Sequence, residues 1–127
     1  GPEYVHQALE RALKNKEAGV ALGAIEALAV NAGEKSLLYR VGMSQPLADA
    51  LSFADRKVQY SAAIAFAEAG PTSAFTGNEL IVRHLASAIS EEGKDELGEG
   101  LSKTYAMRAV QAVYKLVRDF FAFERAI

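Results

Sequence analysis

The sequence predicts an all-α protein assembled from helix pairs that repeat along the chain. Apolar residues recur at helical spacing through most of the 127 residues, and glycine or proline marks the ends of the segments. The sequence also aligns with itself at an offset of 38 residues, a length typical of two-helix repeats. Half of the residues, 50%, are apolar, so a single domain of this length can bury a sizeable core.

The first helix pair is predicted over residues 3–15 and 20–32. The first segment is amphipathic, and the second is rich in Ala and Leu and ends before Gly33, which is typical of a helix C-cap. Gly19 and Gly23 each lower the helix propensity by about 1 kcal/mol relative to Ala. We therefore expect them where another helix approaches closely.

The second pair has the clearest start and stop signals. Ser44 is placed as the N-cap of its first helix, with Pro46 in the first turn, where a missing amide costs nothing. After a turn, Asp55 is placed as the cap of the second helix, which runs to Ala69 and is stopped by Gly-Pro at 70–71.

The third pair is predicted to begin near residue 77, because Thr76 and Glu79 have the spacing of a capping box, and its first helix runs to Glu91. The stretch 93–100, GKDELGEG, is predicted to be a mobile loop. The last helix spans about 102–126 and is much the longest.

Equivalent apolar positions support the repeat. A shift of 38 residues aligns the first helix of one pair with the first helix of the next. The equivalent residues are Leu9, Ala12 and Leu13 in the first pair, Leu47, Ala50 and Leu51 in the second, and Leu85, Ala88 and Ile89 in the third. The last helix matches its counterparts only after about nine extra residues, which the Gly-rich loop supplies. We divide the chain into a tag remnant, 1–2, and a single domain, 3–127, with repeats at about 3–33, 44–71 and 77–127.

The segment PLADALSFADRKVQYSAAIAFAEAG resembles a HEAT repeat of the bacterial kind, in the armadillo-like group. The matching positions are Pro46, Leu47, Leu51, Asp55, Val58, Ala62, Ala63 and Ala65. The segment departs from the pattern at Gln59, where Arg is usual, and at Phe66, where Leu is usual. The resemblance implies an α-solenoid of about three HEAT-like helix pairs with a long C-terminal helix, whose second helices line a concave surface that binds another macromolecule.

Charge and composition argue against several functions. The net charge is −2 with acids and bases interspersed, which disfavours avid nucleic-acid binding. The chain has no cysteine, which excludes disulfides and thiolate metal sites and is compatible with a reducing compartment, so we expect a cytoplasmic location. No apolar run approaches the roughly 20 residues that span a bilayer. We therefore expect neither a nucleic acid nor a membrane as partner.

Catalytic residues are not visible in the sequence. His6 and His84 are the only histidines, and we expect both to be surface or partly buried helix residues rather than metal ligands. The carboxylate pairs at 91–92 and 95–96 lie beside glycines and are interpreted as parts of a solvated segment. We expect no enzyme activity, no cofactor and no metal.

Two surfaces are candidates for binding a partner. The first is the exposed side of the second helices, represented by Lys57, Gln59, Ser61 and Glu68, together with Glu26. The second is the C-terminal helix, which has apolar residues over more than half of its circumference and ends with Phe120, Phe121, Phe123 and Ile127. Three interpretations stay open for that helix: it wraps the open end of the stack, it forms a homo-oligomer, or a further repeat of a longer protein covers it.

The function predicted from these observations is that of a non-enzymatic helical-repeat scaffold for protein–protein interaction, with the chain considered as a fragment of a larger protein. The partner's identity does not follow from the sequence. The alternative is a HEAT-like nucleic-acid-binding or small enzyme domain, which would normally show a basic groove or clustered catalytic side chains.

Overall fold

The structure, a computed structural model, describes residues 2–31, 39–69 and 79–126 of the chain. Over these ranges the regular elements are helices, and a lone β-bridge joins Val41 to Ser44. The all-α prediction is therefore confirmed for this part of the chain. The helices are α1 (Pro2–Lys14), α2 (Ala18–Asn31), α4 (Pro46–Ala50), α5 (Arg56–Ala69), α6 (Glu79–Ser90) and α7 (Leu101–Ala126).

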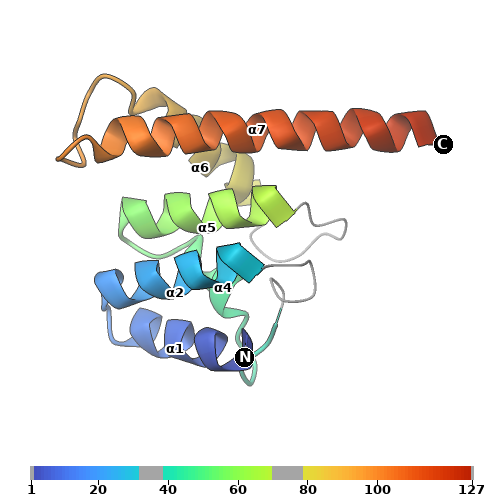
Figure 1. Cartoon of the computed structure of the whole chain (residues 1–127). Coiled ribbons are helices and arrows are strands. Elements are labelled where there is room, and N and C mark those ends of the chain that lie inside the picture. Colours follow the sequence, from blue (N-terminus) through green and yellow to red (C-terminus); the bar gives the residue numbers. More distant parts are fainter. Residues whose placement is uncertain (1, 32–38, 70–78, 127) are drawn as a thin grey trace.

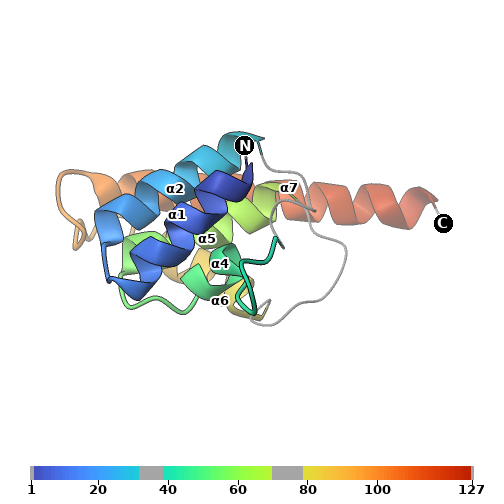
Figure 2. The ribbon, with the colours of Figure 1, turned by 90° about the horizontal axis from the view of Figure 1, so that it is seen from below.

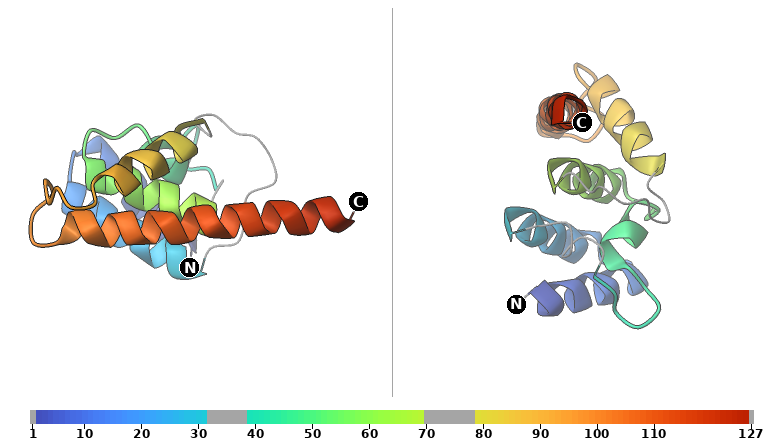
Figure 3. Two further views of the ribbon diagram at one scale, coloured as in Figure 1. Left: turned by 90° about the horizontal axis from the view of Figure 1, so that it is seen from above. Right: turned by 90° about the vertical axis from the view of Figure 1, so that its right-hand side faces the viewer.

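The helices form two layers. Helices α2, α5 and α7 lie side by side in one layer, and α1, α4 and α6 lie on the other side (Figures 1 and 3). Each helix of the first layer contacts the one that precedes it in the chain: α1 packs on α2, α4 on α5 and α6 on α7. The view from below shows that α7 continues well beyond the other helices (Figure 2). One end of α7 therefore projects from the helical body.

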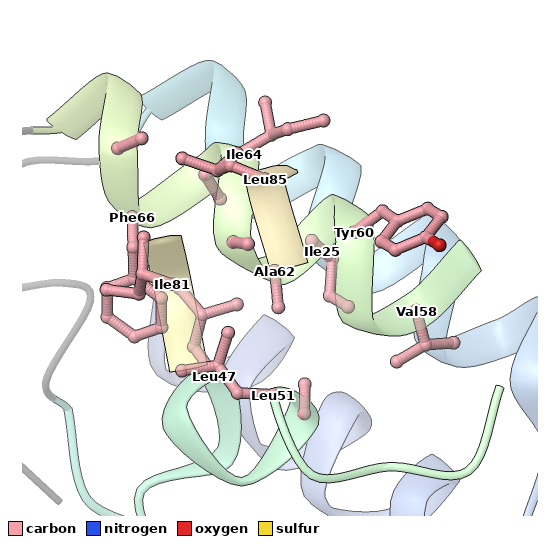
Figure 4. Close-up of a cluster of buried hydrophobic side chains, with 14 of the residues drawn as sticks. Ile25, Leu47, Leu51, Val58, Tyr60, Ala62, Ile64, Phe66, Ile81 and Leu85 are labelled. Atoms are coloured by element: carbon pink, nitrogen blue, oxygen red, sulfur yellow. The ribbon is translucent and has the colours of Figure 1, made fainter. Parts of the chain in front are cut away.

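Helix α5 is the centre of the core. The whole segment 60–67 is buried, because α5 contacts α2, α4, α6 and α7. A helix that is apolar on all sides needs such surroundings. Its side chains meet Ile25 of α2, Leu47 of α4 and Leu85 of α6 (Figure 4). The alanines of α5 leave room for these larger side chains, so neighbouring helices can approach closely.

Two helix caps were predicted for the second pair, and the structure confirms one of them. Oδ1 of Asp55 accepts hydrogen bonds from the backbone N–H groups of Lys57 (2.8 Å) and Val58 (3.2 Å), which confirms it as the cap of α5. The prediction for Ser44 was wrong, because α4 begins after Gln45 and the Ser44 hydroxyl donates to Oδ2 of Asp49 at 2.9 Å instead. The predicted signals at Gly33, 70–71 and Thr76 lie outside the described residues.

The expectation for the glycines of α2 was also wrong. Gly19 and Gly23 are exposed, and a Cβ atom added at either position would meet nothing within 4 Å. No described part of the chain therefore requires an absent side chain there. Gly42 is different, since its φ of +63° lies in the left-handed region that favours glycine, at the tip of the turn between Val41 and Ser44.

Candidate protein interface

The sequence predicts a binding groove along α2, α5 and α7. In the structure, side chains of these helices fill the space where that groove was expected. Ser61 is only 1% exposed, and its Oγ lies 3.1 Å from the Tyr105 hydroxyl of α7. Arg108 of α7 reaches across to Glu26 of α2, with Nη1 and Oε1 3.1 Å apart, and its guanidinium lies 5.7 Å from the centre of the Tyr105 ring. The prediction of Ser61 as an exposed groove residue was therefore wrong, because α7 covers it.

The other residues predicted for this surface are not brought together. Lys57 and Glu68 lie near opposite ends of α5, and the backbone carbonyl of Glu68 accepts a hydrogen bond from Lys115 of α7. Gln59 is half-buried, and its amide donates to the carbonyl of Phe53. Gln59 therefore holds the turn before α5 rather than facing a ligand.

A buried polar cluster ties α5 to the end of α6. Glu91 is only 5% exposed, and its Oε1 accepts hydrogen bonds from Arg56 Nη1 (2.7 Å) and from the Tyr60 hydroxyl (3.1 Å). The Tyr60 hydroxyl also lies 3.0 Å from Ser87 Oγ, and Arg56 contacts Glu96 at 3.3 Å. The expectation of a solvated carboxylate at position 91 was wrong, because the turn that follows α6 places it against Arg56 and Tyr60 of α5.

The pKa values of two groups in this cluster are raised, for different physical reasons. Burial raises the pKa of Tyr60 above its ordinary value of 10.0, and the hydrogen bond to the carboxylate of Glu91 raises it further. The hydrogen bond from Arg56 to Glu96, together with the charge of Glu91, raises the pKa of Arg56. Oε1 of Glu91, the Tyr60 hydroxyl and the Arg56 guanidinium are engaged with one another, so we interpret the cluster as a structural tie between α5, α6 and the loop that follows.

The histidines lie apart from each other. His6 is fully buried and stacks on Tyr39, with ring centroids 5.1 Å apart, so the expectation of a surface or partly buried position was wrong for this residue. His84 is half-buried as expected, and its Nε2 lies 2.6 Å from the carbonyl oxygen of Leu51. Among the described residues, no three His, Cys, Asp or Glu side chains are grouped so that they could hold a metal ion.

An open depression of about 640 Å³ lies between α1 and the turn before α4. Its lining includes two charged contacts that are already satisfied: Glu10 pairs with Lys14 at 3.0 Å, and Asp49 accepts the hydrogen bond from Ser44. The depression therefore offers few free polar groups to a ligand.

The outer side of α7 carries the most distinctive surface. Four large apolar side chains at helical spacing are about half or more exposed, and we call them the outer stripe: Met107 (52%), Val110 (49%), Tyr114 (68%) and Val117 (49%). The opposite side of the same helix is buried against α5 and α6 through Tyr105, Ala109 and Ala112. Helix α7 is therefore apolar on two opposite sides, and one of them is open.

The sequence indicated this surface only in part. It predicted an unusually apolar C-terminal helix, but it placed the interface at Phe120, Phe121 and Phe123, whose side chains lie outside the described part of the structure. The signal that would have located the outer stripe is the spacing of three, four and three residues from Met107 to Val117.

Comparison of the chain with protein-family models, with curated proteins and with solved structures finds no match. Among the described helices, none is both long and apolar enough to cross a membrane. The resemblance to HEAT repeats therefore stays a prediction from sequence.

Proposed function

We propose that this chain is a HEAT-like α-solenoid unit that acts as a non-enzymatic scaffold for protein–protein interaction and binds its partner through the outer stripe of α7. The observation that carries the proposal is the row of four large apolar side chains on one open helix face. Contiguous exposed apolar surface of this kind marks interaction sites in soluble proteins. Tyr and Met are also enriched in protein interfaces.

The order of the helices supports the solenoid part of the proposal. Successive helix pairs place their second members, α2, α5 and α7, next to one another in the same layer (Figure 3). In a repeat stack each pair buries its apolar faces on its neighbours. The outer stripe is an apolar face that no described part of the chain covers, which favours a partner on this face of α7.

A protein partner is favoured over a nucleic acid by the positions of the cations. Two of the basic side chains of α7 are already engaged within the chain, Arg108 with Glu26 and Lys115 with the carbonyl of Glu68. A nucleic-acid surface needs clustered cations that face solvent. Titration with duplex DNA at low salt tests the alternative, since saturable binding there would favour it over the scaffold. We place the scaffold in the cytoplasm, consistent with a chain without cysteine.

The experiment that tests this proposal compares the proteins that are cross-linked to the wild type with those that are cross-linked to two variants. The double variant Val110→Glu with Tyr114→Glu puts two charges in the outer stripe, whereas the control Val82→Glu changes a residue of α6 that is 68% exposed. Chemical cross-linking in the source cells should recover proteins with the wild type and the control that the double variant loses. Identical sets of captured proteins from all three would contradict the proposal.

A further inference from the structure

We infer that Met107 is a site of reversible oxidation by peroxides, and that its sulfoxide prevents a partner from docking on the outer stripe of α7. The inference rests on the proposed function, because it concerns the regulation of the same surface. It adds the residue that is modified, the chemistry and the direction of the effect.

Met107 is both exposed and part of an apolar row. Its side chain is 52% exposed at the start of the outer stripe, whereas its neighbours Tyr105 and Ala109 are buried. The chain has no cysteine and two methionines, so their thioethers are the only sulfur atoms that a peroxide can attack. Peroxides convert an accessible thioether to the sulfoxide. We therefore expect Met107 to react while the core of the protein stays folded.

The step is a two-electron oxygen transfer from a peroxide such as hydrogen peroxide. The sulfur of Met107 donates a lone pair to one peroxide oxygen, the S–O bond forms, and the O–O bond breaks. The hydrogen of the transferred oxygen passes to the departing oxygen, which leaves as water. The thioether is thus oxidised to the sulfoxide, and the peroxide is reduced. Methionine sulfoxide reductases reverse the change.

The sulfoxide places a polar group in the apolar row. The thioether sulfur is only a weak hydrogen-bond acceptor, whereas the sulfoxide is polar and its oxygen accepts hydrogen bonds readily. A partner that covers the outer stripe removes this oxygen from water. Burying a polar group without a donor costs free energy, so oxidation lowers the affinity of the partner.

Lys103 favours the oxidised form. It precedes Met107 by four residues and is exposed, and residues at this spacing are neighbours on the surface of a helix. Long side chains in helices lean toward the preceding turn, which directs Met107 toward Lys103. The ammonium group of Lys103 can donate a hydrogen bond to the sulfoxide oxygen, whereas it gains little from the thioether. The pair therefore keeps the polar oxygen on the open face of α7.

Met43 provides a control within the same chain. It is 95% exposed, in the turn beside α1, and α1 and α7 lie at opposite ends of the stack (Figures 1 and 3). Oxidation of Met43 therefore leaves the outer stripe unchanged. Two variants separate the two sulfur atoms, because Met43→Leu keeps only Met107 and Met107→Leu keeps only Met43.

The first test measures the modification itself. The wild type is treated with hydrogen peroxide, mass spectrometry of its peptides follows the sulfoxide at each methionine, and circular dichroism checks the helix content. We expect sulfoxide at both positions in a folded chain, and its removal by methionine sulfoxide reductases. A thioether at Met107 that persists after Met43 is fully oxidised overturns the inference.

The second test measures docking. Oxidised Met43→Leu and Met107→Leu are freed of peroxide and cross-linked in an extract of the source cells, beside the untreated double variant Val110→Glu with Tyr114→Glu. The proteins that the double variant loses should fall by about 10-fold or more with oxidised Met43→Leu, and return after treatment with the reductases. Oxidised Met107→Leu should keep them.

The outcomes separate this inference from the proposed function. If the double variant loses captured proteins but oxidised Met43→Leu keeps them, the scaffold function stands and its control by oxidation is overturned. If the double variant loses none, the scaffold function through the outer stripe fails, and the control that rests on it fails as well.

Discussion

Tyr60 is a buried side chain whose hydroxyl contacts a charged group. Its ring is 1% exposed in the core, and its hydroxyl meets Ser87 and the buried carboxylate of Glu91. The neutral phenol is favoured there, first because burial disfavours the charged form and then because ionisation would place a second negative charge beside the carboxylate. The sequence does not indicate this role, because the apolar pattern around Tyr60 predicts only a core residue.

Tyr60→Phe tests that role through pH dependence. The raised pKa of Tyr60 contributes stability that is fully present below the unfolded-state value of 10.0 and is lost as pH rises through the folded-state pKa. We expect urea unfolding to show a decline in stability above that pH for the wild type, and a smaller decline for Tyr60→Phe. The variant should also lose about 1–3 kcal/mol at neutral pH, because the polar partners lose a donor. Tyr4→Phe, at a residue 79% exposed, should keep the wild-type decline.

Gly23→Ala tests the finding that the glycines of α2 lie in open space. We expect the free energy of unfolding to rise by about 0.5–1 kcal/mol, because Ala restricts the unfolded chain and favours the helix. Gly42→Ala is the control and should destabilise, since its φ of +63° strains any side chain. A loss of stability at position 23 would mean that something does pack there.

At the scale of the element, caps and turns explain where the helices of the second pair begin. Asp55 holds two backbone N–H groups of α5, and Gln59 holds the carbonyl of Phe53 in the turn before it. Local hydrogen bonds of this kind involve residues close in the chain, so the sequence predicted the start of α5 correctly. Helix α4 is short and ends at Ala50.

Asp55→Ala should cost about 0.5–2 kcal/mol of stability, because two N–H groups in the first turn of α5 lose their acceptor. Ser44→Ala is the matched control and should cost less, since Ser44 holds only the exposed side chain of Asp49. Thermal unfolding followed by circular dichroism measures both. Equal losses would contradict the assignment of Asp55 as the cap.

At the scale of the whole molecule, α5 joins the two ends of the structure. It contacts α2 on one side and α7 on the other, and the ion pair between Arg108 and Glu26 spans it. A layered stack held through one central helix should unfold as a unit when that helix is damaged. The open outer stripe of α7, by contrast, lies outside this core and can be altered without loss of the fold.

Ile64→Ala tests the central role of α5. The side chain is fully buried, so its truncation should cost about 2–5 kcal/mol and lower the temperature of a single cooperative transition. The control Val30→Ala, at a residue of α2 that is 82% exposed, should change the stability by less than about 0.5 kcal/mol. Calorimetry that shows two separate transitions for Ile64→Ala would contradict the single unit.

The sequence by itself determined the all-α class, the ends of most helices and the apolar excess of the last one. Those features depend on helical periodicity and on caps, which act between residues a few positions apart. Only the tertiary structure decided that Ser61 and Glu91 are buried and that the outer stripe is open. Burial depends on partners remote in the chain, such as Tyr105, 44 residues from Ser61, and Arg56, 35 residues from Glu91. The sequence around each residue does not indicate these contacts, because they form only when helices remote in the chain stack on one another.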